Sequence, residues 1–274
     1  MRKLILGIMT AVAVSGASLS AAETTPTDFK AEYIEMDALK QKLNDNGLDV
    51  IATHKVAGSN DYSVVIYSSK DLLKAAKIEN RGFIAALHIL HNSKDKEIVV
   101  SNPEYYMRAF LQKDYKDGMA KPVNDALAKA LGKLTPTADS LKTKKLKKYK
   151  FMVGMPKYDD FATVGKGTTA ELLKKLQSNA KDRIVFTKKI KDDGSVILCG
   201  VALPAKLENF NQKIGTVKQS HLLPYSVLLA DGKARIMHAK FYLALSFPRL
   251  TMGEFMKIMS VPGDIKDEFK NLFK

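Results

Sequence analysis

The sequence has one cysteine and no tryptophan in its 274 residues. Cys199 has no partner for an intramolecular disulfide, and it lies in an almost continuous apolar run of strand type, residues 195–203. A buried free thiol behaves as a small hydrophobic side chain, whereas a reactive thiol requires an accessible, electropositive site. We therefore expect Cys199 to be a structural residue.

Arginine is also scarce. The formal net charge is +15, but lysine supplies 38 of the 44 basic residues and arginine only 6. Nucleic-acid sites favour arginine because its guanidinium contacts phosphates and bases in a bidentate manner. No basic segment is interleaved with aromatic residues at a stacking spacing. The composition therefore predicts a solvated, lysine-rich surface and no nucleic-acid partner.

Motifs for common chemistries are absent too. The sequence has no Gly-x-Ser-x-Gly elbow, no His-Glu-x-x-His and no cysteine pair. Residues 165–169, Gly-Lys-Gly-Thr-Thr, lack the preceding glycine of a phosphate-binding loop. They predict a turn in which Thr168 or Thr169 caps a helix. We predict no catalytic residue and no cofactor.

The N-terminus has the layout of a secretory signal peptide. Arg2 and Lys3 precede an apolar stretch, residues 4–14, and small residues follow up to Ala22. This pattern predicts that residues 1–22 are removed by cleavage near Ala22. The apolar stretch is shorter than the roughly 20 residues that a membrane-spanning helix needs. We expect a soluble protein that is periplasmic or secreted.

Three segments of the first part of the chain return in the same order later. Residues 50–56, 62–67 and 89–98 are similar to residues 183–190, 195–200 and 227–236. The repetition predicts an internal duplication, in which two tandem copies of one module are joined by a linker. The expected parts are a first module at 30–133, a lysine-rich linker at 134–148 and a second module at 149–274.

Each module shows the same alternation of helical and strand patterns. Helical spacing at 37–44, 70–78 and 169–179 alternates with strand pairs. Asp192-Asp193-Gly194 is a strong hairpin signal, and Asp231-Gly232 predicts a second turn. The second module is expected to begin with a strand at 151–155, and residues 83–91 and 204–214 are expected to be strand and helix. The pattern predicts an α+β fold made of two copies of a two-layer helix-hairpin-helix-hairpin-helix module.

The second module resembles a known family. Residues 222–229 contain a Leu-Pro pair before a strand, residues 231–236 supply the turn and next strand, and residues 247–250 read Phe-Pro-Arg-Leu. These features resemble the bacterial domain of unknown function three-hundred-and-two. The first module matches through the Asn-Pro of residues 98–105 but has no proline at 85–87. The resemblance, over residues 36–112 and 151–260, implies a compact two-layer α+β fold and transfers no active site.

Two groups of residues have metal-like spacing. His88 and His91 lie three apart on an expected strand, so they point to opposite faces and do not share a metal. Met252, Met256 and Met259 share one face of an expected helix, and His238 lies in the preceding strand.

Thioether sulfur suits Cu(I), so the methionine group is a candidate soft-metal site. A methionine face also fills protein cores. We expect the core arrangement, with the methionines buried against apolar neighbours, and retain copper as the alternative.

The resulting functional expectation is an exported binding or interaction protein without catalytic activity, whose small-molecule or protein partner is unknown. A groove between the two modules is the expected binding place. The alternatives are a periplasmic enzyme, such as a hydrolase, with a site in one diverged module, and a copper-binding protein. The lysine run at 142–150 is suited to weak contact with an anionic membrane surface, although solubility explains it equally well.

Overall fold

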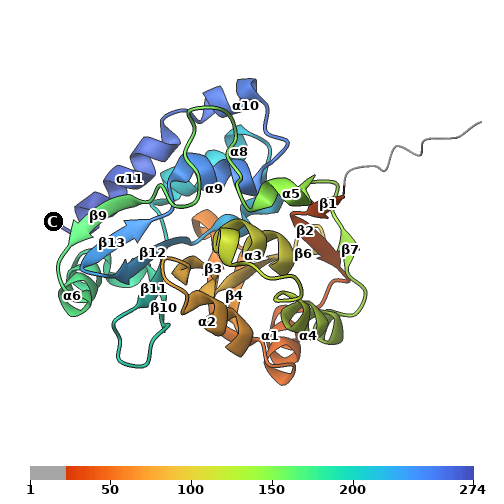
Figure 1. The fold of residues 1–274 in the computed structure, drawn as a ribbon. Helices are drawn as coiled ribbons and strands as arrows, with labels where there is room; N and C mark the ends of the chain where they lie inside the picture. Colours follow the sequence, from red (N-terminus) through yellow and green to blue (C-terminus); the bar gives the residue numbers. More distant parts are fainter. Residues whose placement is uncertain (1–22) are drawn as a thin grey trace, which may run out of the picture.

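The computed structural model describes residues 23–274, which form a mixed α+β fold with three antiparallel sheets (Figure 1). The expected signal peptide, residues 1–22, lies outside the described residues. Within residues 23–274, no helix is both long enough and apolar enough to cross a membrane.

The first large sheet belongs to residues 23–133, here called the first half, and takes its last strand from the segment that follows. Its strand order is β3-β4-β5-β6-β2-β7. The strands are β2 (Asp28–Ala31), β3 (Asp49–Lys55), β4 (Tyr62–Ser68), β5 (Leu87–Asn92), β6 (Glu97–Ser101) and β7 (Thr135–Pro136). The helices are α1 (Met36–Asp45), η1 (Val56–Gly58), α2 (Lys70–Ala76), η2 (Gly82–Ala85), α3 (Pro103–Leu111), η3 (Gln112–Asp114) and α4 (Lys121–Leu131).

The second large sheet belongs to residues 149–274, the second half. Its strand order is β10-β11-β12-β13-β9. The strands are β9 (Ala162–Lys166), β10 (Ile184–Lys189), β11 (Ile197–Val201), β12 (Tyr225–Ala230) and β13 (Lys233–Ile236). The helices are α6 (Thr169–Ala180), η4 (Lys181–Arg183), α7 (Ala205–Glu208), α8 (Phe210–Lys213), η5 (Val217–Leu222), α9 (Ala239–Ser246), α10 (Met252–Lys257) and α11 (Val261–Leu272).

The predicted linker is folded into the body of the protein. Strand β7 pairs with β2, and β8 (Ser140–Lys142) pairs with β1 (Thr24–Pro26) in a small third sheet. The short helix α5 (Thr143–Leu146) follows and buries Leu146 completely. Residues 134–148 therefore tie the start of the described chain to the first sheet.

The predicted helix-hairpin-helix-hairpin-helix module is wrong. Each large sheet begins with a strand, β2 or β9, which comes before the first helix and pairs with β6 or β13. The hairpins are also not separate units, because β4 pairs with β5 and β11 pairs with β12. Pairing between distant strands is a tertiary contact, which the local periodicity of a sequence does not contain.

Three local predictions also differ from the structure. The strand expected at 151–155 is a turn, and the expected helix at 204–214 is split into the four-residue helices α7 and α8. The expected strand at 83–91 begins only at Leu87, since Gly82–Ala85 forms the helical turn η2. All four residues of η2 are buried, and an apolar run without alternation does not distinguish a strand from a buried helical turn.

Other local signals are confirmed. Thr168 caps α6 in a capping box with Glu171, as the reading of residues 165–169 predicted. Asn102 likewise caps α3, with Pro103 at the first helical position. Both caps depend only on residues a few positions apart, so the local sequence is enough to specify them.

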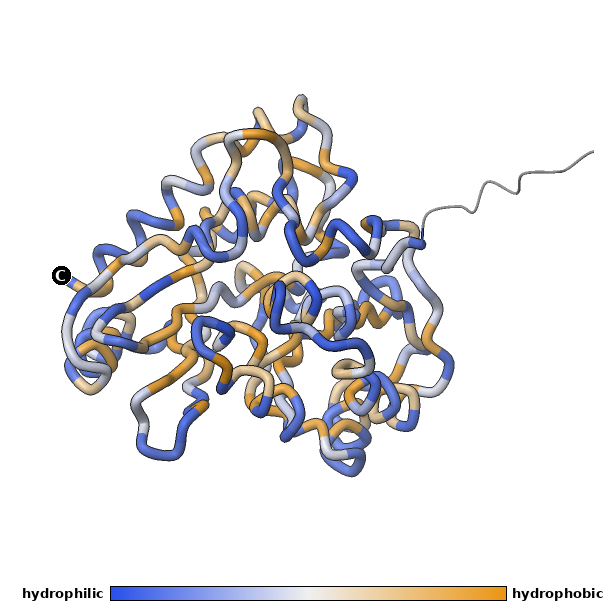
Figure 2. The backbone as a smooth tube through the Cα atoms, viewed as in Figure 1, coloured by the Kyte–Doolittle hydropathy of each residue, from blue (hydrophilic) through white to orange (hydrophobic). Residues whose placement is uncertain are grey.

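The apolar core is continuous across the two halves. Figure 2 shows apolar segments concentrated in the strands and hydrophilic segments along the outer turns. Tyr158 lies at the centre of an aromatic cluster, with ring centroids 6.4 Å from Phe83, 5.4 Å from Phe110 and 6.0 Å from Phe241. Since these rings come from both halves, the two sheets are held by one core.

Candidate functional site at the junction of the two halves

Each half sends one connection onto the sheet of the other half. Residues 69–86 join β4 to β5, and their η2 turn packs against β11 and β12. Residues 202–224 join β11 to β12, and their η5 turn packs against β4, β5 and β6. The two connections therefore build the junction.

The first connection approaches its partner sheet closely. A Cβ added at Gly82 would overlap the side chain of Leu228 in β12 and would lie 3.2 Å from Ile190 Cδ1. Glycine is needed here because the backbone of η2 rests directly on the opposite sheet.

The second connection supplies a buried carboxylate. Glu208 at the end of α7 is 1% exposed and lies 3.0 Å and 3.1 Å, through its two oxygens, from Nε2 of His54 in β3. The same carboxylate accepts hydrogen bonds from the backbone N–H of Ala57 at 2.6 Å and of Leu203 at 3.0 Å. A buried carboxylate is tolerated because its oxygens are hydrogen-bonded, and here the bonds join the two halves.

A second buried histidine–carboxylate pair crosses the junction. His221 Nε2 in η5 lies 2.7 Å from Asp28 Oδ1 in β2, and both side chains are buried. His88 in β5 donates its Nδ1 hydrogen to the carbonyl of His221 at 2.5 Å. Burial lowers the pKa of His88 to about 4, so this ring is neutral at physiological pH. The Nδ1 atom of His221 is buried and has no hydrogen-bond partner among residues 23–274.

A groove of about 510 Å³, lined in part by Asp28 of this second pair, is called here the junction groove. Both halves and the segment between them line it. The lining residues are Asp28, Lys30, Tyr62, Glu97, Val99, Thr137, Ala138, Asp139, Gly215, Thr216, Val217, Lys218, Gln219 and Arg249. The η5 turn and the glycine before it thus form one wall, and strands β2, β4 and β6 contribute the other.

The charged side chains of the junction groove form ion pairs with one another. Lys30 Nζ lies 3.0 Å from Glu97 Oε1, and Lys218 Nζ lies 3.5 Å from Glu97 Oε2. Arg249 Nε lies 3.6 Å from Asp139 Oδ1, and Gln219 donates to Asp139 Oδ2 at 2.6 Å. The hydrogen bond from Lys30 lowers the pKa of Glu97, so this carboxylate is charged at neutral pH.

The cations are more accessible than their carboxylate partners. The side chains of Lys30, Lys218 and Arg249 are 56%, 57% and 70% exposed. Those of Glu97 and Asp139 are only 26% and 14% exposed. Exposed ion pairs contribute little stability, about 0–1 kcal/mol each. The three cations are therefore held only weakly by their present partners.

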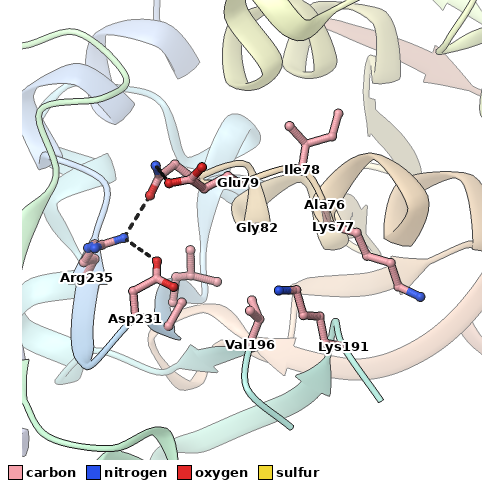
Figure 3. Close-up of a pocket in the computed structure, with 12 residues that line it drawn as sticks. Ala76, Lys77, Ile78, Glu79, Gly82, Lys191, Val196, Asp231 and Arg235 are labelled. Atoms are coloured by element: carbon pink, nitrogen blue, oxygen red, sulfur yellow. Dashed lines mark hydrogen bonds and ion pairs between the residues drawn. The ribbon is translucent and has the colours of Figure 1, made fainter. Parts of the chain in front are cut away.

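A smaller cavity of about 80 Å³ lies where η2 meets the second sheet (Figure 3). Arg235 Nη1 donates to Asn80 Oδ1 at 2.9 Å and lies 3.4 Å from Asp231 Oδ2. The backbone carbonyl of Asn80 accepts the hydroxyl of Tyr158. The cavity has room for only a few waters, at about 30 Å³ each, and its arginine is used to join the halves.

A third hollow, of about 830 Å³, belongs to the second half alone. It lies between the α7–α8 segment and α11, which faces it with Asp264, Asp267 and Glu268. Glu268 is held by Arg183 at 2.7 Å, and Asp267 by Lys270 at 3.2 Å. All of its lining residues belong to the second half.

The candidate methionine site is on the surface. Met252 and Met256 in α10, and Met259 just beyond it, are 46%, 56% and 59% exposed. The expected core arrangement is therefore wrong. The buried residues of this stretch are Phe255 and Ile258, which occupy the adjacent stripe of the helix.

His238 is half-buried and caps α9 by accepting a hydrogen bond at Nδ1 from the Lys240 N–H, at 3.2 Å. Burial, together with the charge of Lys240, lowers the pKa of His238. Within residues 23–274 no group of three or more His, Cys, Asp or Glu side chains is placed to hold a metal ion.

The remaining singled-out residues have structural roles. His91 Nε2 lies 3.0 Å from the carbonyl of Ile34, whereas His88 contacts His221, so the two histidines serve different neighbours as their spacing predicted. Cys199 is fully buried, and burial raises its thiol pKa to about 12. The thiol is therefore protonated, which supports its structural role.

The sequence alone gave none of the charged residues of the junction groove a binding role. Lys30, Glu97, Lys218 and Arg249 come from four separate segments, and Arg249 was part only of the Phe-Pro-Arg-Leu segment of the family resemblance. Only the general expectation that a binding groove lies between the two modules pointed to this place.

Comparison with known proteins gave no match: no family model, no curated protein and no solved structure is significantly similar to this chain. Only the fold and the geometry of the junction bear on its function.

Proposed function

We propose that this chain is an exported binding protein without catalytic activity and that its ligand occupies the junction groove. The observation that carries this proposal is the convergence of Lys30, Lys218 and Arg249 on one hollow. Lys30 comes from the first half, while Lys218 and Arg249 come from the second. The groove volume of about 510 Å³ is within the usual range of small-molecule sites, roughly 300–1,000 Å³.

The chemistry of the groove favours a small organic anion. Arg249 is suited to a carboxylate or phosphate, because its guanidinium offers paired donors. Tyr62, Val99 and Val217 provide apolar surface for the body of such a molecule, and Thr137 and Gln219 offer hydrogen-bonding groups. Charge-assisted hydrogen bonds contribute about 1.5–3 kcal/mol each, so one lost cation contact weakens binding at least about tenfold.

The export part of the proposal rests on the composition of residues 1–22. Cleavage after Ala22 would leave β1, which starts at Thr24, and the hydrogen bond from the Thr143 N–H to the Glu23 carbonyl intact. Protein isolated from its natural host is expected to begin at or near Glu23 on N-terminal sequencing. A chain that keeps Met1 would contradict export.

The relationship to the bacterial domain of unknown function three-hundred-and-two is likewise a proposal. The segments that carry the resemblance, residues 222–229 and 231–236, form strands β12 and β13 with the turn between them. That family brings no active site, which agrees with a binding role.

An enzyme is the second candidate, because His221 and Asp28 form a hydrogen-bonded pair like the base and its orienting carboxylate in hydrolases. Both side chains are at most 4% exposed, so a substrate does not reach them in this conformation. Replacement of His221 by Gln is therefore expected to lower stability. Loss of a hydrolytic activity with unchanged stability would favour the enzyme.

The binding proposal is tested with residues 23–274 and a panel of small anions, namely succinate, citrate and glucose 6-phosphate. We expect at least one to raise the melting temperature and to bind in calorimetry. Arg249→Gln and Lys218→Gln should each weaken that binding about tenfold or more. Lys206→Gln, which changes the hollow beside α11, is the matched control. Equal losses in control and groove variants, or no binding at millimolar concentration, would contradict the proposal.

A further inference from the structure

The exposed large apolar side chains of residues 23–274 gather at one end of the molecule. They are Met152, Val153, Met252, Met256 and Met259, called here the methionine apex. The rings of Phe151 and Phe255 stack at a centroid distance of 6.2 Å, which holds the turn at 151–155 against α10. Helix α10 lies at the outer edge of the fold (Figure 1).

The backbone of the turn at 151–155 holds an apolar residue at its tip. The Met155 N–H donates to the Met152 carbonyl at 3.1 Å, and Gly154 has a φ of 82°, which closes the turn. Val153 at the tip is 91% exposed. An apolar cluster exposed in this way marks a contact surface, since the isolated protein gains nothing from hydrating it.

Exposed lysines flank the methionine apex in the sequence. The exposed lysines are Lys144, Lys145, Lys148 and Lys150 before the turn, Lys157 after it, and Lys257 in α10. Among the ion pairs of the described residues, none uses these six lysines. A protruding apolar tip with free lysines around it matches a layer of anionic headgroups above an apolar interior.

A second copy of the chain is a poor occupant of this surface. The full chain has a net charge of +15, and Arg2 and Lys3 supply only two of these charges. Two such copies repel each other, and the lysines around the apex would meet lysines. An anionic bilayer has the complementary charge.

We propose that the methionine apex and its lysines form a docking surface for an anionic phospholipid bilayer. Met152, Val153 and Met256 enter the interface between headgroups and acyl chains. The ammonium groups of Lys148, Lys150 and Lys257 lie among the lipid phosphates. This inference is independent of the ligand in the junction groove.

The test is co-sedimentation of residues 23–274 with vesicles of phosphatidylcholine alone or of phosphatidylcholine and phosphatidylglycerol at 3:1. We expect binding to the anionic vesicles only, with weakening in 0.5 M NaCl. The double variant Val153→Ser, Met256→Ser should lower the partition coefficient at least about tenfold. Its melting temperature should not change, because both side chains are exposed.

The charge component has a matched control. Lys148→Gln, Lys150→Gln should weaken binding, whereas Lys113→Gln, Lys129→Gln, at exposed lysines of the first half, should weaken it less. Three results would overturn the proposal: no binding to anionic vesicles, unchanged binding of the serine variant, or equal losses in the two lysine pairs. A surface that binds a protein instead would give the first of these results.

Discussion

The five strands of the second large sheet follow the order of β3, β4, β5, β6 and β2 in the first, which adds β7 as a sixth strand, but the connections that cross between the sheets differ. Residues 69–86 of the first half cross with α2 and η2, while residues 202–224 of the second half cross with α7, α8 and η5. The first connection docks through Gly82 on Leu228 and through buried Arg81, which lies 3.0 Å from Asp114 and 2.6 Å from Asp159. These contacts hold the two halves of the protein together.

The second connection has both a buried and an exposed role. Glu208 and His221 form the buried pairs with the first half, while Lys218 and Gln219 face the junction groove. The two connections join corresponding strands but differ in length and polarity. The first only holds the halves together, whereas the second also lines the junction groove. Substitutions in the two connections test this distinction.

The largest effect is expected at Glu208. Glu208→Ala leaves His54 and the N–H groups of Ala57 and Leu203 without their buried partner. We expect the free energy of unfolding to fall by about 3–5 kcal/mol, measured by urea denaturation. Glu208→Gln keeps the shape and part of the bonding, so it should cost less. A loss below about 1 kcal/mol for Glu208→Ala would show that the pair does not hold the halves together.

His88 should make the junction sensitive to acid. Its pKa falls from 6.5 to about 4 on folding, so between these values the unfolded chain binds more protons. The stabilisation is present above pH 6.5 and is lost as the pH falls towards 4, up to about 3 kcal/mol. Urea midpoints of wild type and His88→Gln across this window give the measurement. Parallel curves for the two proteins would exclude His88 as the cause.

Gly82→Ala tests the close approach of the first connection. The added methyl group must displace Leu228, which we expect to cost about 1–3 kcal/mol. Leu228→Ala should relieve part of this cost in a double-mutant cycle. Gly253→Ala in α10 is the control, because its Cβ meets nothing within 4 Å. If both glycine variants behave alike, η2 is not tightly docked.

The smallest effect on stability is expected in the exposed part of the second connection. Lys218 makes exposed ion pairs with Asp95 and Glu97, so Lys218→Gln should change the free energy of unfolding by less than about 0.5–1 kcal/mol. The same variant should weaken anion binding in the junction groove. The matched comparison is Arg81→Gln, measured in the same denaturation series. A larger loss is expected there because the Arg81 side chain is only 6% exposed and pairs with both Asp114 and Asp159.

The sequence by itself determined features that depend on near neighbours. The cap of α6 by Thr168 and Glu171 and the hairpin turn at Asp231-Gly232 are both present as predicted. Of the predicted methionine face, Met252 and Met256 lie in helix α10, whereas Met259 lies beyond its end, and the predicted inward orientation is wrong. A helical pattern offers two adjacent apolar stripes here, and only packing decided that Phe255 and Ile258 face inward.

Tertiary structure decided the rest. The bonded residues His54 and Glu208 are 154 positions apart, and Asp28 and His221 are 193 apart, so no local pattern relates them. Strands β2 and β9 are defined by their pairing with β6 and β13 rather than by their own short sequences. The sequence shows local preferences for helix, strand and turn. Burial and charge pairing between distant segments form only when the chain folds, because folding brings those segments together.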